Sequence, residues 1–200
     1  MILEHTVGLF THPDEEWATI RTHHESAPKL YIQHTLLLAL IPAVAAYFGT
    51  TQTGWTLGTE NPVTLTQASA LNLCTLFYVA MLAGVFILGK FIDFMAITYG
   101  VGEAEHRGLE LAAYAATPLF LAGTVALYPD IWLNMFVGLI GVAYSVYLLY
   151  EGLPILMNIP KERGFLFASS VLTVGLVMLV ALIATSVIIW SFGIGPVYTM

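Results

Sequence analysis

The stretch LAAYAATPLFLAG, residues 111–123, has a proline in the middle of an apolar run that is long enough to cross a membrane. Pro118 removes one helix hydrogen bond, and its ring crowds the carbonyl of Tyr114, four residues earlier. The freed carbonyl needs a new donor, from Thr117 or from a neighbouring helix. The alanines around it let such a neighbour approach closely. We interpret Tyr114 and Pro118 as one packing joint, which acts as a hinge only if a cavity opens beside it.

The composition of the whole chain is that of a membrane protein. Of its 200 residues, 58% are hydrophobic and 10% are charged, against about 25% charged in a typical soluble domain. A helix needs about 20 apolar residues to span a bilayer. Five runs meet this length: 31–50, 69–89 (with an extension to 99), 109–128, 131–150 and 165–190. The sequence therefore predicts an all-α polytopic membrane protein with five transmembrane helices.

The basic residues predict the orientation of these helices. Lys and Arg gather on the inner side of membranes, and acidic residues contribute little to the rule. All six Lys and Arg residues of the chain lie in the N-terminal segment, the second loop or the fourth loop: Arg21, Lys29, Lys90, Arg107, Lys161 and Arg163. The remaining loops and the C-terminal tail have none. This alternation predicts a cytoplasmic N-terminus and a periplasmic C-terminus.

Residues 1–30 form a separate acidic and histidine-containing cytoplasmic segment, before a five-helix domain at 31–200. Pro13, followed by three acidic residues, is typical of a helix start. Trp17 and Ile20 share one face of this short amphipathic helix. Two placements remain open: on the inner leaflet, or docked against the cytoplasmic side of the protein itself.

The histidines are the candidate metal ligands, because imidazole with carboxylate binds zinc and similar ions. All six lie on the predicted inner side, and His23, His24 and His34 are the candidates we select. The adjacent positions of His23 and His24 point to different faces of a helix, which is poor metal-site spacing. We favour solvated loop histidines, with His34 capping the first span at the membrane interface.

No charged residue lies at the centre of a span. Four lie at the inner ends of spans two, three and four: Lys90, Asp93, Glu110 and Glu151. Lys90 and Asp93 are three residues apart and are predicted to pair. A polar path across the membrane is an alternative use of uncharged residues in the spans: Asn72, Tyr78, Thr117, Asn134 and Tyr144. We favour hydrogen bonds between helices as their role.

Several functions are not supported by any pattern in the sequence. It has no GxSxG, HExxH, CxxC, P-loop or haem-attachment motif, so no enzyme activity and no cofactor are predicted. An intramembrane enzyme is a minor alternative, without a visible nucleophile and base. The net charge of −7 argues against a nucleic-acid partner. Alanines and glycines at small-xxx-small spacing leave a homo-oligomer open.

The five-span layout with its acidic N-terminal segment resembles the Yip (Ypt/Rab-interacting protein) domain family, in its bacterial inner-membrane branch of YohC-like proteins. The resemblance rests on LFTHPDEEW, LLLALIPAVAAYFGTTQTGW, AAYAATPLFLAGTVALYP and YLLYEGLPILMNIPKERG, and so covers nearly the whole chain. The aromatic-x3-proline pair of the family corresponds to Tyr114 and Pro118. The eukaryotic motif has Gly before the Tyr, where this chain has Ala113. The resemblance implies a multi-pass protein of the bacterial inner membrane.

Two functions follow as hypotheses. The first is a non-enzymatic membrane-organising or adaptor protein, whose acidic inner face (residues 1–30, Glu103, Glu105 and Glu162) meets an unidentified cytoplasmic or membrane protein. The alternative is a small-solute or metal-ion transporter or channel, with Pro118 and Pro42 as flexible elements. A continuous polar cavity past Tyr114 would favour the alternative, and a dry, tightly packed centre would oppose it.

Overall fold

The computed structural model describes residues 2–23, 26–55, 62–102 and 107–199. These residues form helices, together with two isolated β-bridges that join Trp55 to Val63 and Leu65 to Tyr198. Within the described residues, five helical segments are long and apolar enough to cross a membrane: Pro28–Thr53, Gln67–Thr98, Gly108–Leu127, Ile131–Leu156 and Lys161–Ser191. The predicted fold class is confirmed. Each segment contains most or all of one run that hydropathy selects.

The first and third spans are built from several helical pieces. The first joins α3 (Ala27–Leu30), a π-helical turn (Tyr31–Thr35), α4 (Leu36–Phe48) and a second π-helical turn (Gly49–Thr53). The third joins α6 (Gly108–Ala115), α7 (Thr117–Ala122) and a 3₁₀ turn (Gly123–Leu127). Its break falls at Ala116, two residues before Pro118, as expected for a proline inside a helix. In contrast, α4 continues unbroken through Pro42.

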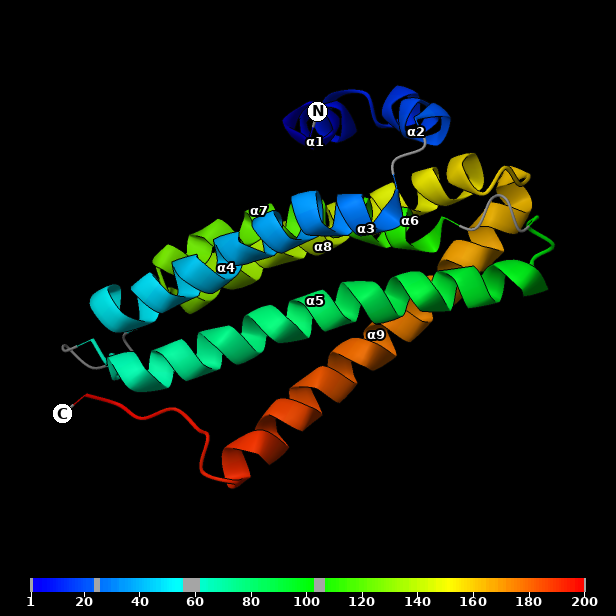
Figure 1. The fold of residues 1–200 in the computed structure, drawn as a ribbon. Helices are drawn as coiled ribbons and strands as arrows, with labels where there is room; N and C mark the ends of the chain where they lie inside the picture. Colours follow the sequence, from blue (N-terminus) through cyan, green and yellow to red (C-terminus); the bar gives the residue numbers. More distant parts are fainter. Residues whose placement is uncertain (1, 24–25, 56–61, 103–106, 200) are drawn as a thin grey trace.

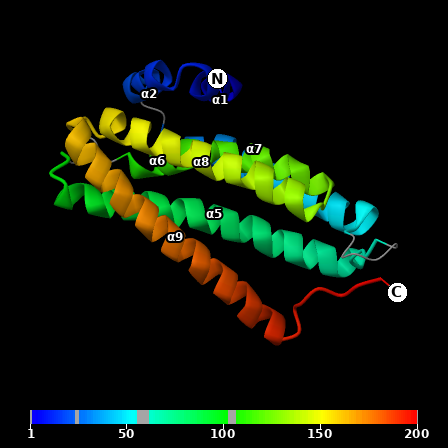
Figure 2. The same cartoon turned by 180° about the vertical axis from the view of Figure 1, so that it is seen from behind.

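The other spans are single long helices: α5 (Gln67–Thr98), α8 (Ile131–Leu156) and α9 (Lys161–Ser191). Helices α4, α6–α7 and α8 lie side by side along one side of α5, and α9 crosses behind them and diverges from α5 (Figures 1 and 2). Glycines allow the closest contact between α5 and α6. A Cβ atom on Gly108 would lie 2.3 Å from the carbonyl oxygen of Gly89, so the two backbones touch there.

The C-terminal tail returns from the far end of α9 to the start of α5 (Figure 1). The Ser69 hydroxyl donates to the carbonyl of Gly195 (3.2 Å) and accepts from the amide of Val197 (2.9 Å). Backbone bonds also join the amide of Thr66 to the carbonyl of Val197 and the amide of Thr199 to the carbonyl of Thr64. The tail therefore connects the separated ends of α5 and α9.

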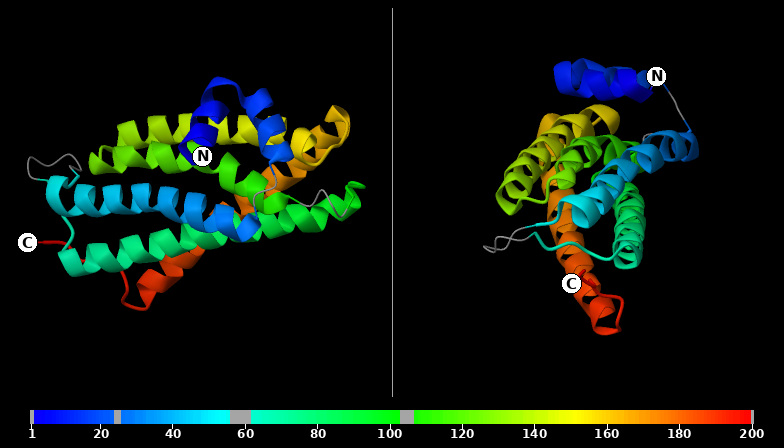
Figure 3. Two further views of the ribbon diagram at one scale, coloured as in Figure 1. Left: turned by 45° about the horizontal axis from the view of Figure 1, so that its top comes forward. Right: turned by 90° about the vertical axis from the view of Figure 1, so that its left-hand side faces the viewer.

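Two short helices, α1 (Ile2–Thr11) and α2 (Pro13–Thr22), form an N-terminal hairpin that lies across the outside of the bundle (Figure 3). The predicted helix start at Pro13 is confirmed. Helix α1 is an addition, since the sequence predicted one helix in this segment. Of the two placements left open, the structure has the hairpin docked on the protein, mainly through α2 on α8. The orientation of the termini across the membrane stays a prediction.

Candidate functional site

The N-terminal hairpin is anchored on the bundle by its apolar side chains. Leu9 and Trp17 are fully buried, and Ile20 is nearly so. The Trp17 indole lies on Gly152 of α8, where a Cβ atom would come within 2.5 Å of the ring. The Tyr144 hydroxyl of α8 also donates a 2.9 Å hydrogen bond to the carbonyl of Leu9 in the hairpin. The shared face of Trp17 and Ile20, which the sequence predicted, is thus the docking face.

Tyr114 lies beneath this hairpin, at the point where it meets the third span. Its side chain is 3% exposed. Its ring centroid is 4.8 Å from that of His34, 6.0 Å from that of His5 and 6.1 Å from that of Trp17. We call these four residues, with Thr117, the Tyr114 site. The site brings together the hairpin, the first span and the third span.

His34 occupies the bundle side of the Tyr114 site. Its side chain is fully buried, and its Nε2 forms a 2.9 Å hydrogen bond with the Thr117 hydroxyl. Within the described residues, its Nδ1 and the Trp17 Nε1 have no hydrogen-bond partner. The expectation that His34 caps the span at the membrane interface is therefore wrong. The first span starts at Pro28, and this places His34 inside the bundle, one residue before the π-helical turn ends.

The Thr117 hydroxyl makes a second bond, to the carbonyl of Ala113 at 3.4 Å. The sequence predicts that the carbonyl of Tyr114, which Pro118 frees, takes a donor from Thr117 or from a neighbouring helix. The hydroxyl instead serves the carbonyl of Ala113, one residue earlier, while the amide of Ala116 donates to the carbonyl of Ala112 at 3.1 Å in the turn between α6 and α7. The break in the third span therefore places the Thr117 hydroxyl between its own helix and the His34 ring of the first span.

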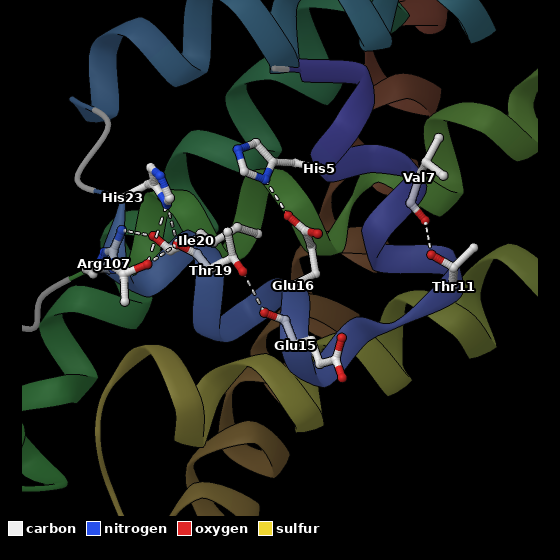
Figure 4. Close-up of polar contacts among 10 residues, drawn as sticks. His5, Val7, Thr11, Glu15, Glu16, Thr19, Ile20, His23 and Arg107 are labelled. Atoms are coloured by element: carbon white, nitrogen blue, oxygen red, sulfur yellow. Dashed lines mark hydrogen bonds and ion pairs between the residues drawn. The ribbon is translucent and has the colours of Figure 1, made fainter.

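On the hairpin side of the site, His5 of α1 pairs with Glu16 of α2 through Nδ1 and Oε1 (Figure 4). Both side chains are mostly buried. Gly8 makes room for the carboxylate, since a Cβ atom there would meet Glu16 Oε2 at 1.9 Å. The pair joins the two hairpin helices and holds the His5 ring near Tyr114. Glu16 is thus turned inward, whereas Asp14 and Glu15 are exposed.

Arg107 secures the opposite end of α2. Its Nη1 donates to the carbonyl of Arg21 (2.8 Å) and its Nη2 to the carbonyl of Ile20 (2.9 Å), as Figure 4 shows. Its guanidinium also forms an ion pair with Glu110, and both side chains are buried. The last carbonyls of a helix lack partners within it. No sequence pattern predicts this role, because an arginine near a helix end gives no signal of the carbonyls that it will reach.

A Yip1 domain matches residues 7–182. The chain belongs to the Yip1 domain family. It is 44% identical to the "Inner membrane protein YohC" of Escherichia coli strain K12, over 96% of this chain and 98% of that protein. The protein of the same name from Escherichia coli O6:H1 strain CFT073 matches to the same extent. No solved structure matches the chain. The family and the location in the inner membrane are thereby confirmed.

The candidate polar-path residues do not come together in this Yip1 domain. The Tyr78 hydroxyl donates to the carbonyl of Leu36 (3.0 Å), and the Tyr144 hydroxyl reaches the hairpin. The Asn134 amide donates to the carbonyls of Tyr128 and Asp130. Asn72 lies exposed on α5, and Thr117 belongs to the Tyr114 site. Pro42 is also used in packing, because a Cβ atom on Gly123 would lie 2.3 Å from its ring.

The charged residues at the inner ends of the spans are also placed separately. The predicted pair of Lys90 and Asp93 is absent in the described part of the chain. Asp93 accepts a 2.7 Å hydrogen bond from the amide of Gly108, and the Lys90 ammonium lies 6.0 Å from the centre of the Phe86 ring. Glu110 pairs with Arg107, and Glu151 is half-buried near the end of α8.

The candidate metal ligands do not form a site within the described residues. His23 is exposed, and its Nδ1 bonds the carbonyl of Thr19 at 3.1 Å. His24 lies outside the described residues, as do Glu103 and Glu105 of the predicted acidic face. No group of three or more His, Cys, Asp or Glu in the described ranges is arranged to hold a metal ion.

Two cavities beside the described part of the bundle bear on the predicted polar path. One, of about 690 Å³, lies at the end of the bundle where α4 ends and α8 begins, and aromatic residues line it, among them Trp55, Tyr128 and Trp132. The other, of about 280 Å³, lies between α5, α6–α7, α8 and α9 and is lined by apolar residues on both sides of the Pro118 break. Tyr114 lines neither of them.

Proposed function

We propose that this Yip1 domain protein is a non-enzymatic adaptor of the inner membrane, whose docked N-terminal hairpin is presented to a cytoplasmic or membrane protein. The observation that carries the proposal is the Tyr114 site. The site uses residues of two spans to fix a hairpin that lies outside the bundle. The proposal takes the cytoplasmic side for the hairpin, as the positions of Lys and Arg predict.

The hairpin is held in a manner suited to presenting one face. Trp17 on Gly152 fixes the middle of α2, and Arg107 binds the carbonyls at its end. A surface held in its binding conformation loses less entropy when a partner binds. The exposed side of α2 carries Asp14 and Glu15, because Glu16 is turned inward to His5. A partner with a basic surface is the natural complement.

The polar residues of the spans support an adaptor more than a transporter. Tyr78, Asn134 and Tyr144 each donate to backbone carbonyls, and in this way they hold helices or the hairpin in place. A transport path needs polar groups that converge on a cavity, and neither cavity described above includes Tyr114. Transport of a solute or metal ion is retained as an outcome of the test.

The experiment is affinity capture of the protein from native membranes in mild detergent, with proteins, lipids and metals analysed in the same sample. We expect a protein partner that is retained by the natural chain and lost from the double variant Asp14→Lys, Glu15→Lys. The matched control is Gln52→Lys, at an exposed position in the turn after α4. Recovery of a stoichiometric solute or metal, or substrate-dependent flux into proteoliposomes, would overturn the proposal.

A further inference from the structure

The apolar cavity of about 280 Å³ is built by four of the five spans. Helix α5 contributes Gly84, α6 contributes Ala112 and Ala116, and α9 contributes Gly175. The spacing of Ala112 and Ala116 predicts close helix packing, but in the structure both border the cavity. Apart from the Ser145 hydroxyl, the lining side chains are apolar. In this cavity the small residues leave empty space between the helices, whereas Gly89 and Gly108 bring two helices into contact.

Residues of α5 and α9 line the cavity on opposite sides. These two helices diverge along their length (Figure 2). On α9, Leu176 and Leu179 are exposed by 53% and 52% at its edge. A Cβ atom on Gly175 would meet nothing within 4 Å, and one on Gly84 would only touch the Leu182 side chain, at 4.0 Å. The two glycines thus keep the mouth of the cavity open.

The C-terminal tail bounds this opening at one end. It joins the end of α9 to the start of α5 through Ser69, Thr66 and Thr64. At the other end, Tyr99 of α5 stacks on Phe167 of α9 with ring centroids 4.6 Å apart. The two helices are therefore in contact at the Tyr99 end and diverge from there, with their far ends connected through the tail. The cavity is a lateral window at the depth of the membrane-spanning segments.

The volume of the cavity selects the occupant. An engineered apolar cavity of about 150 Å³ binds benzene, so 280 Å³ holds a hydrocarbon of about ten carbons. The surrounding bilayer supplies hydrocarbon at this depth. We propose that the window between α5 and α9 binds one acyl chain of a membrane phospholipid.

The bound chain lies against residues that do not otherwise face lipid. Ala112 and Ala115 are only 2% and 8% exposed, yet both line the cavity. Lipid that merely surrounds the protein reaches the outer faces of α5 and α9 and not these alanines. Contact of an acyl chain with α6 therefore distinguishes a lipid bound in the cavity from the lipid of the surrounding bilayer. This inference does not depend on the proposed adaptor function.

The test uses the full chain, reconstituted with a phosphatidylethanolamine that carries a photoreactive diazirine in its acyl chain. After illumination, we expect crosslinks on Ala112 and Ala115 of α6, mapped by mass spectrometry. In native mass spectrometry from mild detergent, we expect one retained phospholipid per chain. Crosslinks confined to exposed residues of α5 and α9 would overturn the proposal.

The matched variants are two helical glycines with open space at Cβ. Gly175→Leu fills the window, whereas Gly138→Leu adds the same side chain on α8 away from it. We expect the first to lower both lipid retention and crosslinking to Ala112 and Ala115 at least fivefold, and the second to leave both unchanged. Gly84→Val is the alternative filling variant if Gly175→Leu does not fold. Equal retention in a folded filling variant and in the Gly138→Leu control would contradict the proposal.

Discussion

The indole of Trp17 lies on the backbone of Gly152, with no space between them for a methyl group. We therefore expect Gly152→Ala to displace the indole and to loosen the hairpin. Trypsin cleavage after Arg21, within α2, reports this loosening. We expect cleavage of the detergent-solubilised variant to be several-fold faster than that of the natural chain.

The control for this prediction is Gly138→Ala, because a Cβ atom at Gly138 meets nothing within 4 Å. The additional change Trp17→Leu in the Gly152→Ala background tests the cause. A smaller side chain relieves the clash, although it also buries less apolar surface. If Gly152→Ala and Gly138→Ala are cleaved at the same rate, Trp17 is not held by Gly152 in solution.

Arg107 makes a second, independent prediction about the hairpin. Arg107→Gln removes the two donors that serve the carbonyls of Ile20 and Arg21, and it leaves the buried Glu110 without this cation. Hydrogen bonds to charged groups contribute about 1.5–3 kcal/mol each. We expect amide hydrogen exchange in residues 13–23 to accelerate about tenfold or more. Arg163→Gln, at an exposed position on α9, should leave this exchange unchanged.

The hairpin shows what the sequence can and cannot predict about this fold. Hydropathy predicts the spans because each run must cross the same thickness of hydrocarbon. Pro13 and the acids after it predict the start of α2, because capping is local. The docking of Trp17 on Gly152 joins residues 135 positions apart, and no local pattern encodes it. Helix α1 was missed for the same reason, since its support comes from Tyr144 and Glu16 in the folded chain.

The Tyr114 site follows the same division. The Tyr-x3-Pro pair is visible in the sequence, and the break beside Pro118 is predicted by the chemistry of proline. The burial of His34 cannot be predicted in this way, because a histidine near the start of a span is equally typical of the membrane interface. Its place depends on how far α3 extends the span beyond the apolar run. The lateral window depends on helix divergence, which composition does not report.

The hydrogen bond between His34 and Thr117 predicts a measurable contribution to stability. Thr117→Val keeps the shape of the side chain but leaves the buried Nε2 of His34 without a partner. Such bonds between transmembrane helices contribute about 0.6–2 kcal/mol. We expect a lower apparent Tm for the variant in thermal unfolding in detergent. Thr173→Val is the control, because its exposed hydroxyl bonds only to its own helix, at the carbonyl of Ser169. An equal Tm for both variants would show that the buried bond contributes little.

The orientation of the chain gives a prediction that labelling can check. In a Cys74→Ser background, a membrane-impermeant maleimide should label Thr199→Cys from the periplasmic side of spheroplasts. It should label Glu15→Cys only after the inner membrane is opened. Both positions are exposed, so the difference reports the side of the membrane alone. Labelling of Glu15→Cys in sealed spheroplasts would reverse the predicted topology and would place the hairpin outside the cytoplasm.

Pro118→Ala tests whether the break in the third span serves the Tyr114 site. The variant restores an amide that can donate to the carbonyl of Tyr114, so α6 and α7 should join into one helix. The gain of a hydrogen bond offsets the lost packing, and we expect the apparent Tm to change little. Straightening the span moves Thr117 relative to His34, and with it the surface on which the hairpin rests. We therefore expect partner capture to fall severalfold.

Pro42→Ala is the matched control, because α4 already continues unbroken through that proline. Capture that is equal in the two variants would reduce the Tyr-x3-Pro pair to a marker of the fold.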